Sequence, residues 1–218
     1  MFKAVIFDMD GVLIDSEPFW RKAAADVYKT IGVPVTEKMC VQTMGVRIDY
    51  AVDYWFQKFP WKSPPKKQVE KMINKKVEEL IIRYGKPKPG VIKSLKFLSG
   101  KGLKNALASS ANMHLIRTVV RTLKIEYFFQ LLHSAEYEMH PKPAPDVYLT
   151  TAKMLDVIPS KCLVIEDSPV GVTAAKNAGM TCIAIPSREI YKNPVFDSAD
   201  YKLDSLTQFI DFFTSLKK

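Results

Sequence analysis

The sequence predicts an α/β protein in which a Rossmann-like parallel sheet carries an inserted all-helical domain. Short unbroken apolar runs end in small or acidic residues, which is typical of strands buried on both faces. These runs cover residues 4–8, 105–109, 162–167 and 181–185. Segments with helical spacing lie between them, and one long stretch near the N-terminus contains helical spacing only. Alternation of strand and helix favours a parallel sheet with helices on both faces.

The helices expected around the sheet come from apolar residues spaced three and four apart. This spacing occurs over residues 91–98, 113–123, 145–155 and 171–178. Asp167 and Ser168 precede Pro169 at the start of the last segment, so we expect one of them to cap that helix, and Ser168 would leave the acid free. Each predicted helix follows or precedes one apolar run, as connections between parallel strands require.

The inserted helical domain is expected directly after the first strand. From Glu17 to Tyr84 the apolar residues keep helical spacing, as in Ala51, Trp55 and Phe59, and no strand-like run interrupts them. The stretch 85–90 contains two prolines and two glycines, which end a helix. We therefore predict a core made of residues 1–14 and 88–218 and a helical domain made of residues 15–87.

Composition places the chain among ordinary globular proteins. Its 218 residues are 47% apolar and 25% charged, which suffices for a hydrophobic core without disulfides. The net charge of +9 would suit a nucleic-acid-binding protein, but the lysines are scattered in twos and threes and form no single stripe. We expect a solvated basic surface and no nucleic-acid partner. A positive field would also attract a small phosphorylated anion.

Cysteine usage and hydropathy predict a cytoplasmic protein. Cys40, Cys162 and Cys182 are far apart and form no CxxC pair, which favours reduced thiols. The N-terminus lacks the order of charged, apolar and small residues found in signal peptides. No window approaches the roughly 18 apolar residues of a membrane span. The expectation is a monomer in the cytoplasm with no membrane partner.

Polar residues end several apolar runs, and these are the candidates for a functional site. In open parallel sheets the ligand lies outside the carboxyl ends of the strands. A lysine joins them from the Lys-Pro-Ala-Pro turn that precedes the run 162–167. The candidates at this edge are Asp8, Asp10, Ser109, Ser110, Lys142, Glu166 and Asp167.

The residue types indicate phosphoryl transfer. Four crowded carboxylates repel one another unless a cation lies between them, and oxygen ligands without nearby His or Cys favour Mg²⁺ over zinc. Asp8 can attack phosphorus and form an aspartyl-phosphate that water later hydrolyses. Asp10 can protonate the leaving oxygen and then activate the water. Ser109 can donate a hydrogen bond to the phosphoryl group, and Lys142 can neutralise its charge.

Four segments resemble the motifs of the haloacid dehalogenase (HAD) superfamily. Residues 7–16 resemble motif I, 108–110 motif II, 142–146 motif III, and 164–168 motif IV. The insertion after motif I resembles the helical C1 cap of the beta-phosphoglucomutase-like branch. The resemblance implies that Asp8 is nucleophile and Mg²⁺ ligand, and that Asp10 is the acid/base and binds the metal through its backbone carbonyl. It also assigns Ser109 and Lys142 to the phosphate and Glu166 and Asp167 to the metal.

The cap sequence suggests a substrate class. Residues 44–49, with 52–55 and 60–61, resemble the bacterial hexitol and 2-deoxyglucose-6-phosphate phosphatases. This resemblance implies a phosphatase of small sugar or sugar-alcohol phosphates. Arg47 would then face the sugar or its phosphate, although a salt bridge with Asp49 or Asp53 is the simpler alternative. Trp55 and its aromatic neighbours fit the hydrophobic core of the cap better than a platform for stacking a sugar.

The sequence argues against several other functions. In phosphoglucomutases a histidine lies ten residues after the acid/base aspartate, whereas this chain has Trp20 there. An indole is not expected to do the proton or hydrogen-bond work of that histidine, so hydrolysis is favoured over a sugar phosphomutase. A phosphoglycolate-type phosphatase is a further alternative. A dehalogenase needs neither Mg²⁺ nor Asp10, and a non-catalytic scaffold needs no crowded acids.

Overall fold

The computed structural model describes residues 1–216, and its centre is a six-stranded sheet in which every neighbouring pair is parallel. The strand order is β3-β2-β1-β4-β5-β6. The strands are β1 (Ala4–Phe7), β2 (Lys104–Ser109), β3 (Leu131–Ser134), β4 (Cys162–Glu166), β5 (Thr181–Ala184) and β6 (Tyr201–Lys202). The four predicted runs are the four central strands. The edge strands β3 and β6 are additional: β6 has only two residues, and the second half of β3 is His133 and Ser134, so neither forms a long apolar run.

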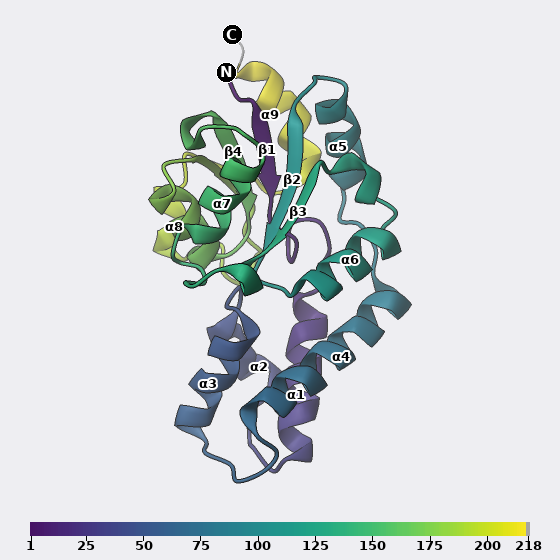
Figure 1. Cartoon of the computed structure of the whole chain (residues 1–218), viewed down its shortest axis with the longest axis vertical. Coiled ribbons are helices and arrows are strands. Elements are labelled where there is room, and N and C mark those ends of the chain that lie inside the picture. The colour runs from purple at the N-terminus through teal and green to yellow at the C-terminus, as the bar shows by residue number, and fades with distance from the viewer. Residues whose placement is uncertain (217–218) are drawn as a thin grey trace.

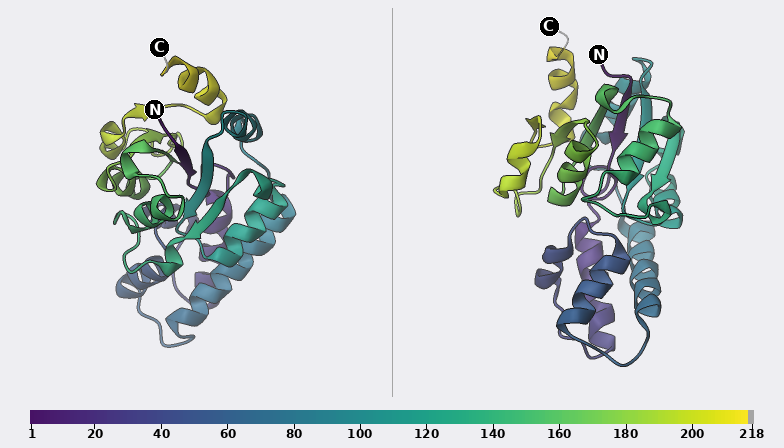
Figure 2. Two further views of the ribbon diagram at one scale, coloured as in Figure 1. Left: turned by 45° about the horizontal axis from the view of Figure 1, so that its top comes forward. Right: turned by 60° about the vertical axis from the view of Figure 1, so that its left-hand side comes forward.

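Helices cover both faces of this sheet (Figure 2). In β1, Val5 and Phe7 face one hydrophobic cluster while Ala4 and Ile6 face the other, because side chains alternate along a strand. The first cluster includes residues of α5 (Val91–Ser99), α6 (Met113–Thr122) and α9 (Phe209–Ser215). The second includes residues of α7 (Asp146–Met154) and α8 (Pro169–Asn177). All four core helices expected from the sequence are present.

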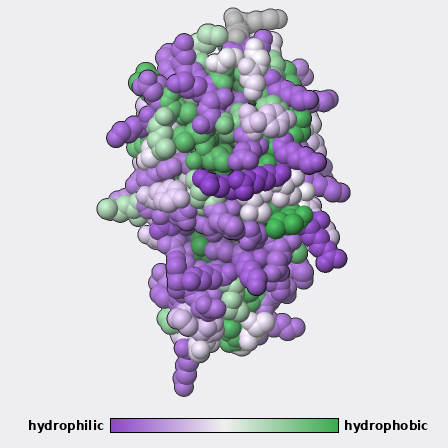
Figure 3. Space-filling model, turned by 45° about the vertical axis from the view of Figure 1, so that its right-hand side comes forward, coloured by the Kyte–Doolittle hydropathy of each residue, from purple (hydrophilic) through white to green (hydrophobic). Residues whose placement is uncertain are grey.

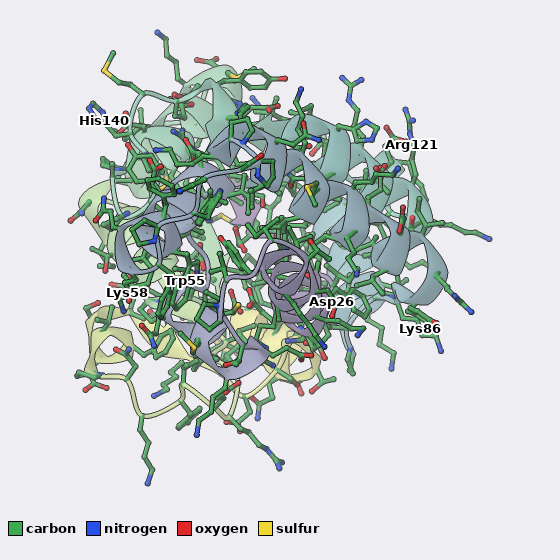
Figure 4. The ribbon with its side chains drawn as sticks, turned by 90° about the horizontal axis from the view of Figure 1, so that it is seen from below. Asp26, Trp55, Lys58, Lys86, Arg121 and His140 are labelled. Carbon is green, nitrogen blue, oxygen red and sulfur yellow. The ribbon has the colours of Figure 1, made fainter. Side chains whose placement is uncertain are left out.

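The inserted segment folds into a helical cap at the end of the molecule opposite α9 (Figure 1). Its α-helices are α1 (Glu17–Thr30), α2 (Glu37–Cys40), α3 (Ile48–Lys58) and α4 (Lys66–Tyr84). Helix α4 packs against α1 and α3 and also reaches α6 of the core. Trp55 is only 1% exposed and stacks on Phe59 with ring centroids 6.3 Å apart. Viewed from the cap end, Trp55 lies toward the centre, whereas Lys86 and Arg121 lie at the periphery (Figure 4).

The two chain segments that join cap and core lie side by side. Ile14 forms a β-bridge with Pro87, and the backbone N–H of Lys88 donates to the carbonyl of Leu13 at 2.9 Å. The entry and exit of the cap are therefore held together directly beneath the carboxyl end of β1. This arrangement places the cap over the edge of the sheet at which Asp8 lies.

The surface and the cysteines agree with the composition. The face shown in Figure 3 is mostly hydrophilic over both core and cap, with smaller hydrophobic patches. The three cysteines are buried and free. Among the described residues, no helix combines the length and the apolar character needed to cross a membrane.

Candidate active site

The candidate residues from the core meet at the carboxyl edge of the sheet. Asp8 follows β1, Ser109 ends β2, and Glu166 and Asp167 stand at the end of β4. Lys142 reaches them from the turn before α7. All of these side chains are buried, and they line one pocket with the cap, except Glu166, which lies behind it. The structure thus brings together residues that are up to 159 positions apart, from Asp8 to Asp167.

Lys142 links two carboxylates of this group. Its Nζ donates to Asp8 Oδ1 at 2.6 Å and to Glu166 Oε1 at 2.7 Å, and its side chain is 2% exposed. The two negative charges raise the pKa of Lys142 against the opposing effect of burial. The ammonium group is therefore charged and fixed beside the nucleophile candidate.

Glu166 is the most thoroughly bonded carboxylate of the site. Its Oε1 also accepts from the hydroxyl of Tyr148 at 2.6 Å, and its Oε2 accepts from the backbone N–H groups of Asp167 and Ser168 and from the Ser168 hydroxyl. Although burial alone would raise the pKa of Glu166, Lys142 and these hydrogen bonds hold it below its ordinary value. Tyr148 was not singled out by sequence analysis, because nothing in its surroundings along the chain marks it.

The site suits a hard divalent cation. One oxygen each from Asp8, Glu166 and Asp167 lies within 4.8 Å of the others. The Asp167 carboxylate accepts no hydrogen bond from any donor in residues 1–216, so its oxygens are open to a ligand. No His or Cys belongs to this group, which favours a metal that prefers oxygen. The Asp10 side chain is outside it, so only its backbone carbonyl is left for the role that the family resemblance implies.

Burial and mutual repulsion raise the pKa values of two carboxyl groups in this cluster. Burial raises the pKa of Asp8 well above its usual range, and the Glu166 and Asp10 charges raise it further against the pull of Lys142. Burial likewise raises the pKa of Asp167, with added repulsion from Glu166 and Asp8. A bound cation would offset both effects. The residues present therefore fit a metal ion.

Gly11 makes room for this arrangement. Its φ of +73° is the left-handed conformation that glycine adopts without strain, and an added Cβ would lie 1.7 Å from Asp167 Oδ2. The loop after β1 can therefore pass close to the metal-binding candidate of β4 only because position 11 has no side chain.

Asp10 is held by two donors from the start of the cap. The hydroxyl of Ser16 and the indole Nε1 of Trp20 both donate to Asp10 Oδ1, the latter at 2.9 Å. Burial raises the pKa of Asp10, and these hydrogen bonds partly oppose the rise. Sequence analysis did not predict this hydrogen bond from Trp20 to Asp10, and whether the indole can replace the histidine of the mutases stays untested.

The two serines at the end of β2 face the cap, which supplies the opposite wall of the pocket. The Ser109 Oγ accepts from the backbone N–H of Ala111 at 3.1 Å. This hydrogen bond does not use the Ser109 hydroxyl proton, which can be donated to a ligand. The Ser110 hydroxyl instead donates to the carbonyl of Gly45 in the cap at 3.0 Å. Besides Trp20, the polar groups on the cap side that sequence analysis had not assigned are Glu17, Arg21, Tyr28, Thr43 and Asn74.

Arg47 does not line the pocket that contains Asp8. Its guanidinium forms a two-pronged salt bridge with Asp49, at 2.8 and 2.9 Å, and donates to the carbonyls of Ala135 and Glu138 in the core. In this structure Arg47 joins cap and core, and its expected contact with the sugar or its phosphate stays a prediction. The alternative salt bridge with Asp49 is present.

Comparisons with known proteins agree with this geometry. The family model of haloacid dehalogenase-like hydrolases matches residues 5–185. Hexitol phosphatase B of Escherichia coli (strain K12) is 38% identical over 206 residues, 94% of this chain and 93% of that protein. A phosphorylated carbohydrates phosphatase of Thermotoga maritima is 34% identical over 178 residues, 82% of each chain. The crystal structure of CbbY from Rhodobacter sphaeroides in complex with phosphate superposes with a TM-score of 0.88 at 22% identity, covering 96% of both chains.

The family model spans more than half of the chain, and both relatives exceed 30% identity over more than two thirds of it. A parallel sheet that carries an inserted helical cap, with acidic side chains at its carboxyl edge, is the architecture expected from the four motifs. This chain belongs to the haloacid dehalogenase-like hydrolases.

Proposed function

We propose that the chain is a Mg²⁺-dependent phosphatase that hydrolyses small sugar or sugar-alcohol phosphates through an aspartyl-phosphate on Asp8. The observation that carries the proposal is the buried group of Asp8, Lys142 and Asp167, which lines a pocket closed on its other side by the cap. Residues 1–14 and 88–218 would form the catalytic core, and residues 15–87 the cap that selects the substrate. Because one chain supplies both walls of the pocket, we propose that a monomer is active.

Each proposed step uses a group placed by the core. Lys142 holds Asp8 in position and draws the negative phosphoryl group toward it. The free carboxylate oxygen of Asp8 attacks phosphorus, and the bond to the leaving alkoxide breaks. Asp10 gives its proton to that alkoxide and later takes one from the water that hydrolyses the aspartyl-phosphate. The Ser109 hydroxyl donates a hydrogen bond to a phosphoryl oxygen.

Magnesium would be held by the carboxylates of Asp8 and Asp167 with the Asp10 backbone carbonyl. When bound, it supplies positive charge that lets these carboxylates stay ionised and neutralises the phosphoryl oxygens. Glu166 borders this site, but both of its oxygens already accept hydrogen bonds within the protein. We therefore assign Glu166 first to holding Lys142 in place and only second to the metal.

The substrate class rests on the relatives and on the cap. The two curated relatives are named as phosphatases of hexitols and of phosphorylated carbohydrates. The cap side of the pocket combines polar side chains with the aromatic group of Trp20, a combination suited to a hydroxylated carbon chain. Since a tryptophan occupies the position of the mutase histidine, we favour hydrolysis over phosphoryl transfer to a second sugar.

The test is a phosphate-release screen with and without Mg²⁺. The panel comprises hexitol 6-phosphates, hexose phosphates, 2-deoxyglucose 6-phosphate, phosphoglycolate and nucleotides. We expect Mg²⁺-dependent release that is fastest with sugar or sugar-alcohol phosphates. Preference for phosphoglycolate or nucleotides would overturn the substrate class, and conversion of a hexose 1-phosphate to its 6-phosphate without free phosphate would overturn hydrolysis.

A further inference from the structure

The side chain of Asn74 stands out in the cap because it has no hydrogen-bond partner. Asn74 lies on α4, and its Oδ1 is shielded from solvent without a donor within reach among residues 1–216. The only other such atom in the described chain is Oδ1 of Asn105, whose Nδ2 nevertheless donates to the carbonyl of Phe128. Within the described residues the Nδ2 of Asn74 makes no such contact, and the Asn74 side chain as a whole is partly exposed.

Asn74 faces the pocket in which the proposed chemistry takes place. It lines the same pocket as Asp8, Lys142 and Asp167, but it belongs to the cap wall, beside Ile73 and Trp55. Asn74 also borders a second, outer cavity. The phosphoryl group is drawn to the core side, where the lysine and the metal ligands lie. The part of the substrate that points away from the phosphoryl group therefore meets the cap wall and Asn74.

An amide oxygen that is shielded from solvent and has no partner has a cost in the free protein. Buried polar groups are nearly always hydrogen-bonded, since leaving one unpaired forfeits its interaction with water. No group in residues 1–216 offsets this cost at Asn74 Oδ1, whereas a ligand that enters the pocket can. A carboxamide carries both a donor and an acceptor, as a hydroxyl group does, so the match holds for either orientation of the amide.

We propose that Asn74 is a specificity-determining residue that hydrogen-bonds a hydroxyl group of the sugar or sugar-alcohol chain while the core holds the phosphoryl group. The proposal rests on the function proposed above and extends it to one residue of the cap. Asn74 takes no part in breaking the phosphate ester. It selects hydroxylated substrates, because a substrate without the matching hydroxyl leaves the shielded amide oxygen unpaired.

The experiment compares Asn74→Ala with Gln68→Ala, which removes an exposed amide from the same helix. Steady-state kinetics are measured with a hexitol 6-phosphate, with a series of its monodeoxy analogues, and with p-nitrophenyl phosphate, which has no hydroxyl to bind. For Asn74→Ala we expect kcat/KM with the hexitol 6-phosphate to fall roughly 10- to 100-fold. With p-nitrophenyl phosphate it should change less than about 2-fold, because the contacts to the phosphoryl group remain.

The monodeoxy analogues, measured with the wild type and with Asn74→Ala, form a double-mutant cycle between the Asn74 side chain and a substrate hydroxyl. With the wild-type enzyme, kcat/KM for one monodeoxy analogue should be lower than for the hexitol 6-phosphate by roughly the same factor. With Asn74→Ala, removal of that hydroxyl should lower kcat/KM almost no further. Thermal unfolding of Asn74→Ala should occur at the wild-type temperature or above, because no intramolecular hydrogen bond is lost. Gln68→Ala should match the wild type in every measurement.

Two results would overturn the inference. Asn74→Ala could lose activity equally on the hexitol and the aryl phosphate together with thermal stability, which would make Asn74 a structural residue satisfied by water. Alternatively, the variant could keep the full wild-type preference for every hydroxyl, which would exclude contact. Failure of the wild-type enzyme to release phosphate from any hexitol or sugar phosphate is a separate outcome, since it would overturn the proposed function itself.

Discussion

The indole Nε1 of Trp20 lies 2.9 Å from Oδ1 of Asp10, so that a side chain of the first cap helix holds the proposed general acid of the core. The Ser16 hydroxyl donates to the same oxygen. An indole N–H can only donate a hydrogen bond. Oδ1 is therefore occupied, and Oδ2 is the oxygen left to exchange a proton with the leaving group and then with water.

Replacing Trp20 with Phe should slow only those reactions that need a proton from Asp10. Without the indole donor, the Asp10 carboxyl group is less well oriented, and general acid catalysis loses part of its usual 10²–10⁴-fold contribution. We expect kcat/KM to fall at least about 10-fold with a sugar-alcohol phosphate, whose alkoxide must be protonated as it leaves. With p-nitrophenyl phosphate, whose leaving group is stable as an anion, we expect little change. The measurement is kcat/KM, which covers the steps up to the aspartyl-phosphate.

Trp61→Phe is the control, because Trp61 donates to the carbonyl of Pro64 within the cap and does not line the pocket. Trp61→Phe should leave kcat/KM unchanged with both substrates. An equal loss with both substrates in Trp20→Phe would show that Trp20 only shapes the pocket and does not orient the acid.

Changing Asp8 to Asn should abolish turnover, because an amide is a poor nucleophile. The substitution also removes one carboxylate from a group of three whose oxygens lie within 4.8 Å of one another. We therefore expect weaker Mg²⁺ binding by calorimetry alongside the loss of phosphate release. In the wild type, chelation by EDTA should stop the reaction and added Mg²⁺ should restore it. Measurable turnover by Asp8→Asn would contradict the aspartyl-phosphate mechanism.

The sequence was sufficient for the central sheet and for the meeting of its polar strand ends. Parallel strands buried on both faces leave an unbroken apolar run, and their carboxyl ends share one edge, so Asp8 and Asp167 could be placed together without coordinates. The predicted cap at Ser168 is present as well, since its hydroxyl accepts from the backbone N–H of Gly171 at 3.1 Å. Such features depend on neighbours along the chain or on the topology of the sheet.

Contacts across the boundary between cap and core could not be predicted in this way. Arg47 reaches the carbonyls of Ala135 and Glu138, which are 88 and 91 residues away. The hydrogen bond from Trp20 to Asp10 depends on the angle at which α1 leaves the core. Spacing along the sequence does not determine that angle, so Trp20 was judged by its chemistry alone and its donor role was missed.

Gly171→Ala should disturb the site through Glu166. A Cβ at position 171 would lie 1.7 Å from Glu166 Oε1, the oxygen that accepts from Lys142 and Tyr148. Glu166 is fully buried and has no space into which to withdraw. We expect a loss of thermal stability of several degrees and a loss of phosphatase activity, because Lys142 loses one of its two anchors. Gly100→Ala, whose added Cβ would meet nothing closer than 3.5 Å, is the control and should be neutral. Wild-type activity in Gly171→Ala would contradict the proposed role of Glu166 in holding Lys142 in place.

Glu17 should make the stability of the metal-free enzyme depend on pH. Burial, with repulsion from Asp10 and other acids, raises the pKa of Glu17 from 4.5 to about 8 in the folded protein. Between these two values the folded state binds a proton that the unfolded state lacks, so this residue lowers stability as pH rises from about 4.5 to about 8. Glu17→Gln removes the effect. Its unfolding temperature in EDTA should exceed that of the wild type by a few degrees at pH 8.5, and the difference should shrink toward zero near pH 5.

Asp15→Asn, which changes an exposed acid two residues away, should show no such trend. A difference between Glu17→Gln and the wild type that is the same at both pH values would show that Glu17 ionises in the folded protein as it does in water.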